Sequence, residues 1–308
     1  MKSQFLLFLK GFAMGSADVV PGVSGGTMAL ITGIYTQWLD AIKSVDAAAV
    51  KNLLQLRFKA AFATIEWKFL LVLLAGLFSA ILFFTRVIPL PELIHTHPVQ
   101  VYGLFFGLIL GSVFIVGKDV GRFDAKALAY TVLGIAIGFW VVNLVPTDTP
   151  EHPLFIFFAG SVAICAMVLP GISGSFILLI LRKYDYVLGQ FSLLGGPETL
   201  SALGVLVPFG LGVLTGIALF TRFLSWLLHH YGKPTMAVLI GFMIGSLWVI
   251  WPWQNRVYET VRGEDKLIHS EPMLPVLGSM DLAWGVGMMA IGLALVLVLE
   301  RLAATRKS

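Results

Sequence analysis

Long apolar stretches separated by short polar segments dominate the chain. They run at about residues 68–88, 99–117, 125–146, 203–228, 235–251 and 282–300. Each is close to the roughly 20 residues that a helix needs to cross the hydrocarbon core of a bilayer. The pattern therefore predicts six full transmembrane helices.

One further apolar segment is interrupted. Its centre, "ADVVPGVSGGTMA" (residues 17–29), contains an acid, a proline, three glycines and two hydroxyl side chains. As one straight helix, residues 5–35 would measure roughly 46 Å, too long for a core of ~30 Å, and the break at Pro21 and Gly22 leaves two arms that are each too short. The pattern favours a re-entrant hairpin, whose bare backbone must be covered by protein or face a water-filled cavity. The first residues imitate a signal peptide, but Lys10 interrupts the apolar run, so we expect this segment to be retained.

The interrupted segment occurs twice. "VVPGVSGGTMALITGIY" (Val19–Tyr35) matches "VLPGISGSFILLILRKY" (Val168–Tyr184), and "FTR" ends at both Arg86 and Arg222. The chain is therefore predicted to be a single membrane domain, residues 1–308, with a first repeat at 1–148 and a second at 149–308.

The basic residues predict the topology, because cytoplasmic loops are enriched in Lys and Arg. If each hairpin returns to its own side, one face collects all 21 Lys and Arg residues except Arg86, Arg182, Lys183, Arg256, Arg262 and Lys266. Both termini then lie in the cytoplasm, and the odd number of spans in each repeat inverts the second. The expected fold class is an all-α integral membrane protein with two inverted-topology repeats, each a re-entrant helical hairpin plus three transmembrane helices.

Composition agrees with a membrane protein, since 58% of residues are hydrophobic and 12% are charged. The basic segment at residues 40–62 predicts an interfacial helix on anionic lipid, so the basic charge is assigned to lipid and no nucleic-acid partner is expected. Glycines at four-residue spacing predict close helix packing at Gly107 with Gly111, Gly134 with Gly138, Gly212 with Gly216 and Gly241 with Gly245. Tyr35 and Tyr184 are expected at the membrane interface rather than at a ligand.

The repeated motif predicts an anion site. Proline and glycine release backbone N–H groups, and short helices beginning near Thr27 and Ser175 would direct their positive ends towards the membrane midplane. A single copy of Pro-Gly would be only a helix kink, but two matched copies with hydroxyls favour a site. The candidate ligands are Gly22, Ser24, Gly25, Gly26, Thr27, Gly171, Ser173, Gly174 and Ser175, with Arg86 and Arg222 for charge. The alternative for the two arginines is snorkelling at span ends.

Asp18 has no acidic counterpart in the second repeat, where Met167 stands at its position. A carboxyl at membrane depth indicates a proton or cation relay, and the alternative is a cap on the hairpin backbone. His229 and His230 lack a partner at metal-ligand spacing, so no metal and no cofactor are expected. The sequence has no P-loop, nucleophile elbow or zinc pair.

Undecaprenyl-pyrophosphate phosphatases also have inverted repeats and a Pro-Gly motif, but Gly25 stands where their arginine lies and Asp18 is the sole nearby acid. Both acid–base chemistry and charge stabilisation are then missing, so we do not expect an enzyme.

The chain resembles the bacterial polyprenyl-phosphate transporters along essentially its whole length, on "GFAMGSADVVPGVSGGTMALITGIY" (Gly11–Tyr35) and "MVLPGISGSFILLIL" (Met167–Leu181). The resemblance implies that the motifs hold the phosphate while undecaprenyl phosphate returns to the inner leaflet of the bacterial cytoplasmic membrane, for reuse in cell-envelope polysaccharide synthesis. The second copy is degenerate, with Ser175 and Phe176 opposite Gly26 and Thr27.

The cost of moving a phosphate against the membrane potential predicts coupling to a proton or sodium ion, with Asp18 as the relay. The expected partners are the polyprenyl-phosphate lipid, membrane lipids, the coupling ion and a further copy of the chain. A small-anion channel or permease is the second hypothesis and a lipid-pyrophosphate phosphatase the third.

Overall fold

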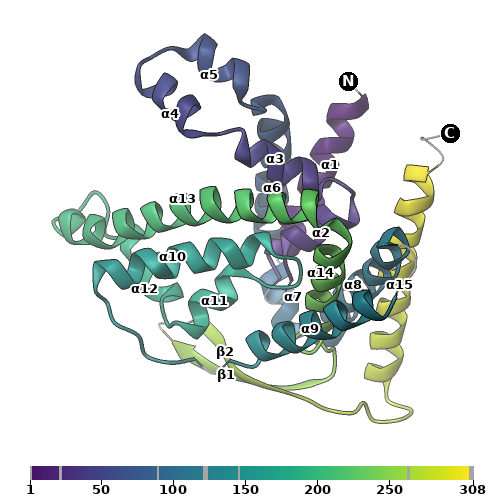
Figure 1. The fold of residues 1–308 in the computed structure, drawn as a ribbon. Coiled ribbons are helices and arrows are strands. Elements are labelled where there is room, and N and C mark those ends of the chain that lie inside the picture. The colour runs from purple at the N-terminus through teal and green to yellow at the C-terminus, as the bar shows by residue number, and fades with distance from the viewer. Residues whose placement is uncertain are drawn as a thin grey trace. The chain divides into compact units, whose positions relative to one another are not determined.

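The computed structural model describes residues 2–20, 23–88, 90–120, 124–144, 146–261 and 264–304. Its helices are α1 (Lys2–Asp18), α2 (Gly25–Ile31), α3 (Tyr35–Lys43), α4 (Ala47–Leu54), α5 (Phe58–Thr64), α6 (Trp67–Arg86), α7 (Leu90–Thr96), α8 (Pro98–Val120), α9 (Ala125–Val142), α10 (Pro153–Val168), α11 (Gly174–Ile180), α12 (Tyr184–Phe191), α13 (Thr199–His230), α14 (Gly232–Ser246) and α15 (Met280–Ala304). The two strands are β1 (Gln254–Val261) and β2 (Glu264–Pro272). Helices therefore form nearly all of the described structure (Figure 1).

Within the described residues, five helices are long and apolar enough to cross a membrane: α6, α8, α9, α13 and α15. They confirm five of the six predicted spans. The sixth, expected at 235–251, is wrong in length, because α14 ends at Ser246 after 15 residues, about 22 Å of helix. Turns follow, and Pro252 has no N–H with which to continue a helix. The protein is a multi-pass membrane protein.

An antiparallel hairpin of β1 and β2 departs from the all-α prediction. Gln254 pairs with Pro272 at its open end, and the register shifts at Val257 and Tyr258. Val257, Tyr258, Thr260 and Val261 are residue types that favour strands, and they follow the last turn after α14.

The chain folds into two compact units. Unit 1 contains Met1–Phe83 and Leu144–Met236, and unit 2 contains Phe84–Asn143 and Ala237–Ser308. Each unit therefore combines segments from both predicted repeats. The division into a first and a second repeat stays a prediction, as do their inverted orientation and the re-entrant placement of the motifs.

Glycine faces bring the long helices of each unit together. In unit 1, α10 packs along α13 (Figure 1), where Gly212 and Gly216 face the carbonyl oxygens of Phe157 and Ser161. In unit 2, α8 packs along α15, and α9 packs along α14. Gly107, Gly134, Gly138, Gly241 and Gly245 each face backbone atoms of the neighbouring helix, while Gly111 faces the side chains of Leu293 and Val296. The predicted role of these glycines in close helix packing is confirmed.

The basic segment at residues 40–62 is divided among α3, α4 and α5, so the prediction of one interfacial helix is wrong. Asp46 caps α4 by accepting a bond from the N–H of Ala49 at 2.7 Å. Leu56 has a positive φ of 58°, which ends the helical path before α5. A capping residue and a left-handed residue therefore divide the segment.

Candidate functional site

The first motif begins where α1 ends. The carboxylate of Asp18 accepts a hydrogen bond from the N–H of Gly25 at 2.7 Å. Ser24 is the N-cap of α2, and its hydroxyl accepts a bond from the N–H of Gly26 at 3.1 Å. Side-chain oxygens therefore satisfy the first two N–H groups of α2, as helix N-termini require. Pro21 and Gly22 lie outside the described residues, so this candidate ligand glycine is not placed.

The second motif forms a similar helix break, between α10 and α11, but with different hydrogen bonds. Gly171 has a φ of 85°, a left-handed conformation that glycine adopts without a Cβ penalty. Ser173 is the N-cap of α11, but its side chain makes no capping bond. Its hydroxyl lies 2.7 Å from that of Ser175 instead. Two hydroxyls are thus paired at the start of α11, where no carboxylate corresponds to Asp18.

The two motifs contact each other inside unit 1. The N–H of Gly171 donates to the hydroxyl oxygen of Thr27 at 2.8 Å. In the opposite direction, the hydroxyl of Ser24 donates to the carbonyl of Leu169 at 3.1 Å. The bonded residues of these two pairs are 144 and 145 positions apart in sequence. The two helix breaks therefore form one hydrogen-bonded group, which we call the motif centre.

Small residues allow the backbones of this centre to approach closely. A Cβ added to Gly26 would lie 2.7 Å from the carbonyl oxygen of Val168, and one added to Gly25 would lie 2.6 Å from the Asp18 carboxylate. A Cβ at Gly174 would lie 2.5 Å from the carbonyl oxygen of Ala163. These three glycines are thus required by contact between the motifs and their flanking helices.

Taken together, the centre contains hydroxyl groups, backbone N–H groups and one carboxylate. Donors of this kind suit a phosphate, while a single acid gives no carboxylate pair for acid–base chemistry. Among the residues that the structure describes, no group of three or more His, Cys, Asp or Glu side chains could hold a metal ion.

Comparison with known proteins identifies the family. Residues 14–267 match the model of a family described as undecaprenyl phosphate translocase-like. The chain belongs to this family.

Two relatives cover most of the chain. It is 36% identical over 304 residues to the polyprenyl-phosphate transporter of Vibrio cholerae serotype O1, covering 96% of both chains. It is 33% identical over 262 residues to the polyprenyl-phosphate transporter of Staphylococcus aureus, covering 81% of this chain and 87% of the relative. No solved structure matches the chain.

The two candidate arginines differ in burial and belong to different units. Arg222 is partly buried on α13, and its guanidinium donates to the carbonyl of Ala218 at 2.7 Å, one turn earlier in the same helix. Arg86 is exposed at the last residue of α6 and belongs to unit 2. Their role as phosphate ligands stays a prediction.

Tyr35 joins the centre, although the sequence placed it at the membrane interface. Its side chain is 2% exposed, and its hydroxyl donates to the carbonyl of Val168 at 3.0 Å. The interfacial prediction for Tyr35 is therefore wrong. Its recurrence as Tyr184 was the available signal, but the carbonyl that it contacts has no signature in the sequence.

Proposed function

We propose that this protein translocates polyprenyl phosphate, in bacteria undecaprenyl phosphate, between the leaflets of the cytoplasmic membrane. Membership of the translocase-like family and the names of its two relatives support the substrate. The observation that carries the proposal is the meeting of the two motifs, which places hydroxyl groups at two adjoining helix breaks. Irregular backbone at membrane depth marks substrate sites in many transporters.

The hydroxyls of Ser173 and Ser175 are the proposed first contacts of the phosphate. Ser24 and Thr27 already bond to the opposite motif, and a carboxylate already occupies the N–H of Gly25. The second motif therefore offers the more accessible donors in this conformation. In a conformation that opens the centre, the first-motif groups and glycines 22, 26, 171 and 174 would complete the shell.

Charge balance supports cation coupling. A phosphate monoester carries about −1.5 to −2 charges at pH 7, and each charge moved across the membrane costs ~2.3 kcal/mol per 100 mV. Inward movement against a negative interior is therefore uphill by several kcal/mol. We propose that a proton or sodium ion crosses with the lipid and that Asp18, the acid bonded to Gly25, is its relay.

The proposed direction is from the outer to the inner leaflet, which returns the carrier lipid for cell-envelope polysaccharide synthesis. Separately, the distribution of basic residues supports the proposal that both termini lie in the cytoplasm. The head group would pass the motif centre while the polyprenyl chain stays in lipid. The phosphate ester is not hydrolysed in this scheme.

The test is leaflet exposure of undecaprenyl phosphate in proteoliposomes, under proton and sodium gradients, with release of inorganic phosphate followed in parallel. Protein-dependent movement without phosphate release is expected. The double variant Ser173→Ala, Ser175→Ala should lose most movement, while the control Ser192→Ala, whose hydroxyl bonds only locally to Gly189, should retain it. The double variant Arg86→Ala, Arg222→Ala should also lose movement if these arginines balance the charge of the phosphate. No movement beyond that in empty vesicles, under either gradient, would reject the proposal.

A further inference from the structure

The segment between α3 and α6 forms a closed excursion from unit 1. At its base, the backbone N–H of Glu66 donates to the hydroxyl of Ser44 at 2.9 Å, which joins residues 22 positions apart in sequence. Between these residues, α4 and α5 pack against each other, and Figure 1 shows the two helices together at the end of the excursion. We call residues 47–64 the α4–α5 hairpin.

The α4–α5 hairpin buries small side chains and exposes large apolar ones. Ala49 of α4 and Ala61 of α5 are fully buried. By contrast, Leu54 and Leu56 in the turn are 81% and 73% exposed, and Phe58 at the start of α5 is 51% exposed. A helical hairpin in water turns its large apolar side chains inward, because their burial supplies much of its stability. The reversed arrangement indicates that an apolar environment covers the outside of the turn.

The hairpin lies next to the beginning of a transmembrane helix. α5 ends at Thr64, and the candidate span α6 begins at Trp67. The rings of Phe62 and Trp67 are in edge contact, with their centroids 5.7 Å apart, which fixes α5 beside the first residue of α6. Tryptophan at the end of a span is typical of the membrane–water interface. The hairpin is therefore positioned at the membrane surface.

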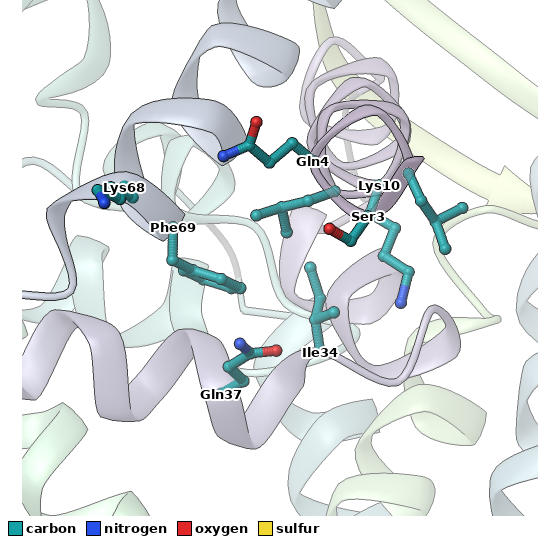
Figure 2. Close-up of a pocket in the computed structure, with 9 residues that line it drawn as sticks. Ser3, Gln4, Lys10, Ile34, Gln37, Lys68 and Phe69 are labelled. Carbon is teal, nitrogen blue, oxygen red and sulfur yellow. The ribbon is translucent and has the colours of Figure 1, made fainter. Parts of the chain in front are cut away.

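The first turn of α6 separates a buried side chain from an exposed cation. Figure 2 shows Phe69 in a cavity of about 330 Å³ beside α1, with Lys68 at the end of the cavity that is far from Lys10. Phe69 is buried, whereas Lys68 is exposed and its ammonium lies 5.6 Å from the centre of the Trp67 ring. Because this ring also contacts α5, Lys68 adds its charge to the surface next to the hairpin.

The hairpin itself is basic. Residues 47–65 contain Lys51, Arg57 and Lys59 and no acidic residue. All three basic side chains are exposed, as are the apolar side chains of the turn. Exposed apolar and basic side chains on one short segment match an anionic bilayer surface, where apolar groups enter the acyl chains and cations stay among the head groups. Charge complementarity therefore favours anionic lipid as the covering environment.

We propose that the α4–α5 hairpin is a membrane anchor whose turn inserts into the leaflet that α6 enters, with a preference for anionic lipid. Leu54, Leu56 and Phe58 reach about 5–10 Å into the boundary between head groups and acyl chains. A single interfacial helix would lie flat and insert along its whole length, whereas this hairpin inserts by its turn. The anchor does not depend on the proposed transport function.

Spin-label depth measurements on the full chain in nanodiscs test the anchor. Cys165 is replaced by alanine, and one nitroxide label is attached to Leu54→Cys or to Leu56→Cys, whose parent side chains are exposed. Oxygen, which concentrates in lipid, and a water-soluble nickel complex are compared as relaxation agents. Strong relaxation by oxygen and weak relaxation by nickel are expected at both positions. A label at Thr64→Cys, at the base of the hairpin, should lie closer to water.

Three results would overturn insertion of the turn. Strong relaxation of both turn labels by nickel would place the turn in water. Weak relaxation by both agents would show that protein, such as a second copy of the chain, covers the turn instead of lipid. Equal depth at the turn and at Thr64→Cys would show that the hairpin lies flat.

The basic residues are tested by lipid composition. Adding a minor fraction of phosphatidylglycerol to phosphatidylcholine nanodiscs should move the turn labels deeper. The triple variant Lys51→Gln, Arg57→Gln, Lys59→Gln should lose this shift, while the control Lys126→Gln, exposed on α9, should keep it. Equal depth of the parent protein in both lipids would overturn the preference for anionic lipid.

Label depth is measured without any transport, so the two proposals fail separately. A protein whose turn inserts but which moves no polyprenyl phosphate would reject the transport function alone. A protein that moves the lipid while its turn stays in water would reject the anchor alone.

Discussion

Thr27 accepts a hydrogen bond from the backbone N–H of Gly171, a residue 144 positions later in the chain. The oxygen is a side chain of α2, and the N–H belongs to the left-handed turn between α10 and α11. Both residues are buried, so neither group has water as an easy substitute.

Thr27→Val should therefore destabilise unit 1. Valine has nearly the same shape but no oxygen, so the Gly171 N–H is left without its acceptor at a cost of about 1–3 kcal/mol. Thermal unfolding in detergent measures the change. Thr64→Val is the control, because that hydroxyl is exposed and bonds only to Ala61 within α5. Equal stability of the two variants would contradict this role of the bond.

Ser24 and Ser173 occupy equivalent positions of the repeat but should respond differently. Ser24 holds the N-terminus of α2 and bonds to Leu169, so Ser24→Ala should lower stability by about 1–2 kcal/mol. Ser173 makes no capping bond, and the Ser175 hydroxyl that it contacts is partly exposed, so Ser173→Ala should cost less stability than Ser24→Ala and should raise the lipid concentration needed for half-maximal transport. Both quantities are measured on each variant, and a large stability loss for Ser173→Ala would contradict the asymmetry.

Asp18→Asn separates the relay from the cap. Asparagine retains a side-chain oxygen that can accept from Gly25, so the fold should persist, while the dependence of transport on the proton or sodium gradient should disappear. Asp18→Leu removes the acceptor as well and should lower stability by about 1–3 kcal/mol. Transport by Asp18→Asn with unchanged pH and sodium dependence would leave Asp18 as a cap only.

Gly212 and Gly210 form a matched pair on α13. A Cβ at Gly212 would collide with the carbonyl oxygen of Phe157 on α10, whereas a Cβ at Gly210 would meet no atom within 4 Å. Gly212→Ala should cost about 1–3 kcal/mol through overpacking. Gly210→Ala should stabilise by about 0.5–1 kcal/mol, because glycine is a poor helix former. Thermal unfolding of both variants tests the pair, and similar melting temperatures would count against glycine-mediated packing.

Gly33 and Arg182 occupy equivalent positions, and both have positive φ, 70° and 49°. Gly33→Ala should therefore destabilise by about 1 kcal/mol through backbone strain alone, since no atom lies within 4 Å of its added Cβ. Arg182→Gly should be neutral or stabilising, because the strain that it relieves offsets an exposed ion pair with Asp148 at 3.0 Å. Denaturation curves of the two variants check this opposition, which a loss in both would contradict.

The sequence predicted the elements that depend on short-range patterns along the chain. Apolar length located α6, α8, α9, α13 and α15, and glycine spacing located their close contacts. The motif residues were found because they recur. Features that depend on tertiary structure were missed. The burial of Tyr35 requires a carbonyl of the other motif. The apolar run at 235–251 resembles a span, but α14 ends within it and the β hairpin follows. Asp18 allowed two interpretations because its partner is a backbone N–H, a group that every residue except proline carries and that leaves no signature in the sequence.

The composition of the two units has a consequence for biosynthesis. Unit 1 needs residues up to Met236, and unit 2 needs residues from 237 onward, although both begin in the first repeat. On the ribosome, the first half of the chain must therefore enter the membrane with neither unit complete. The glycine faces of α8 and α9 lack their partners until α15 and α14 have been synthesised, a period when membrane chaperones and proteases have access to an unfinished protein. A message that stops after the first repeat would yield two partial units rather than one folded half.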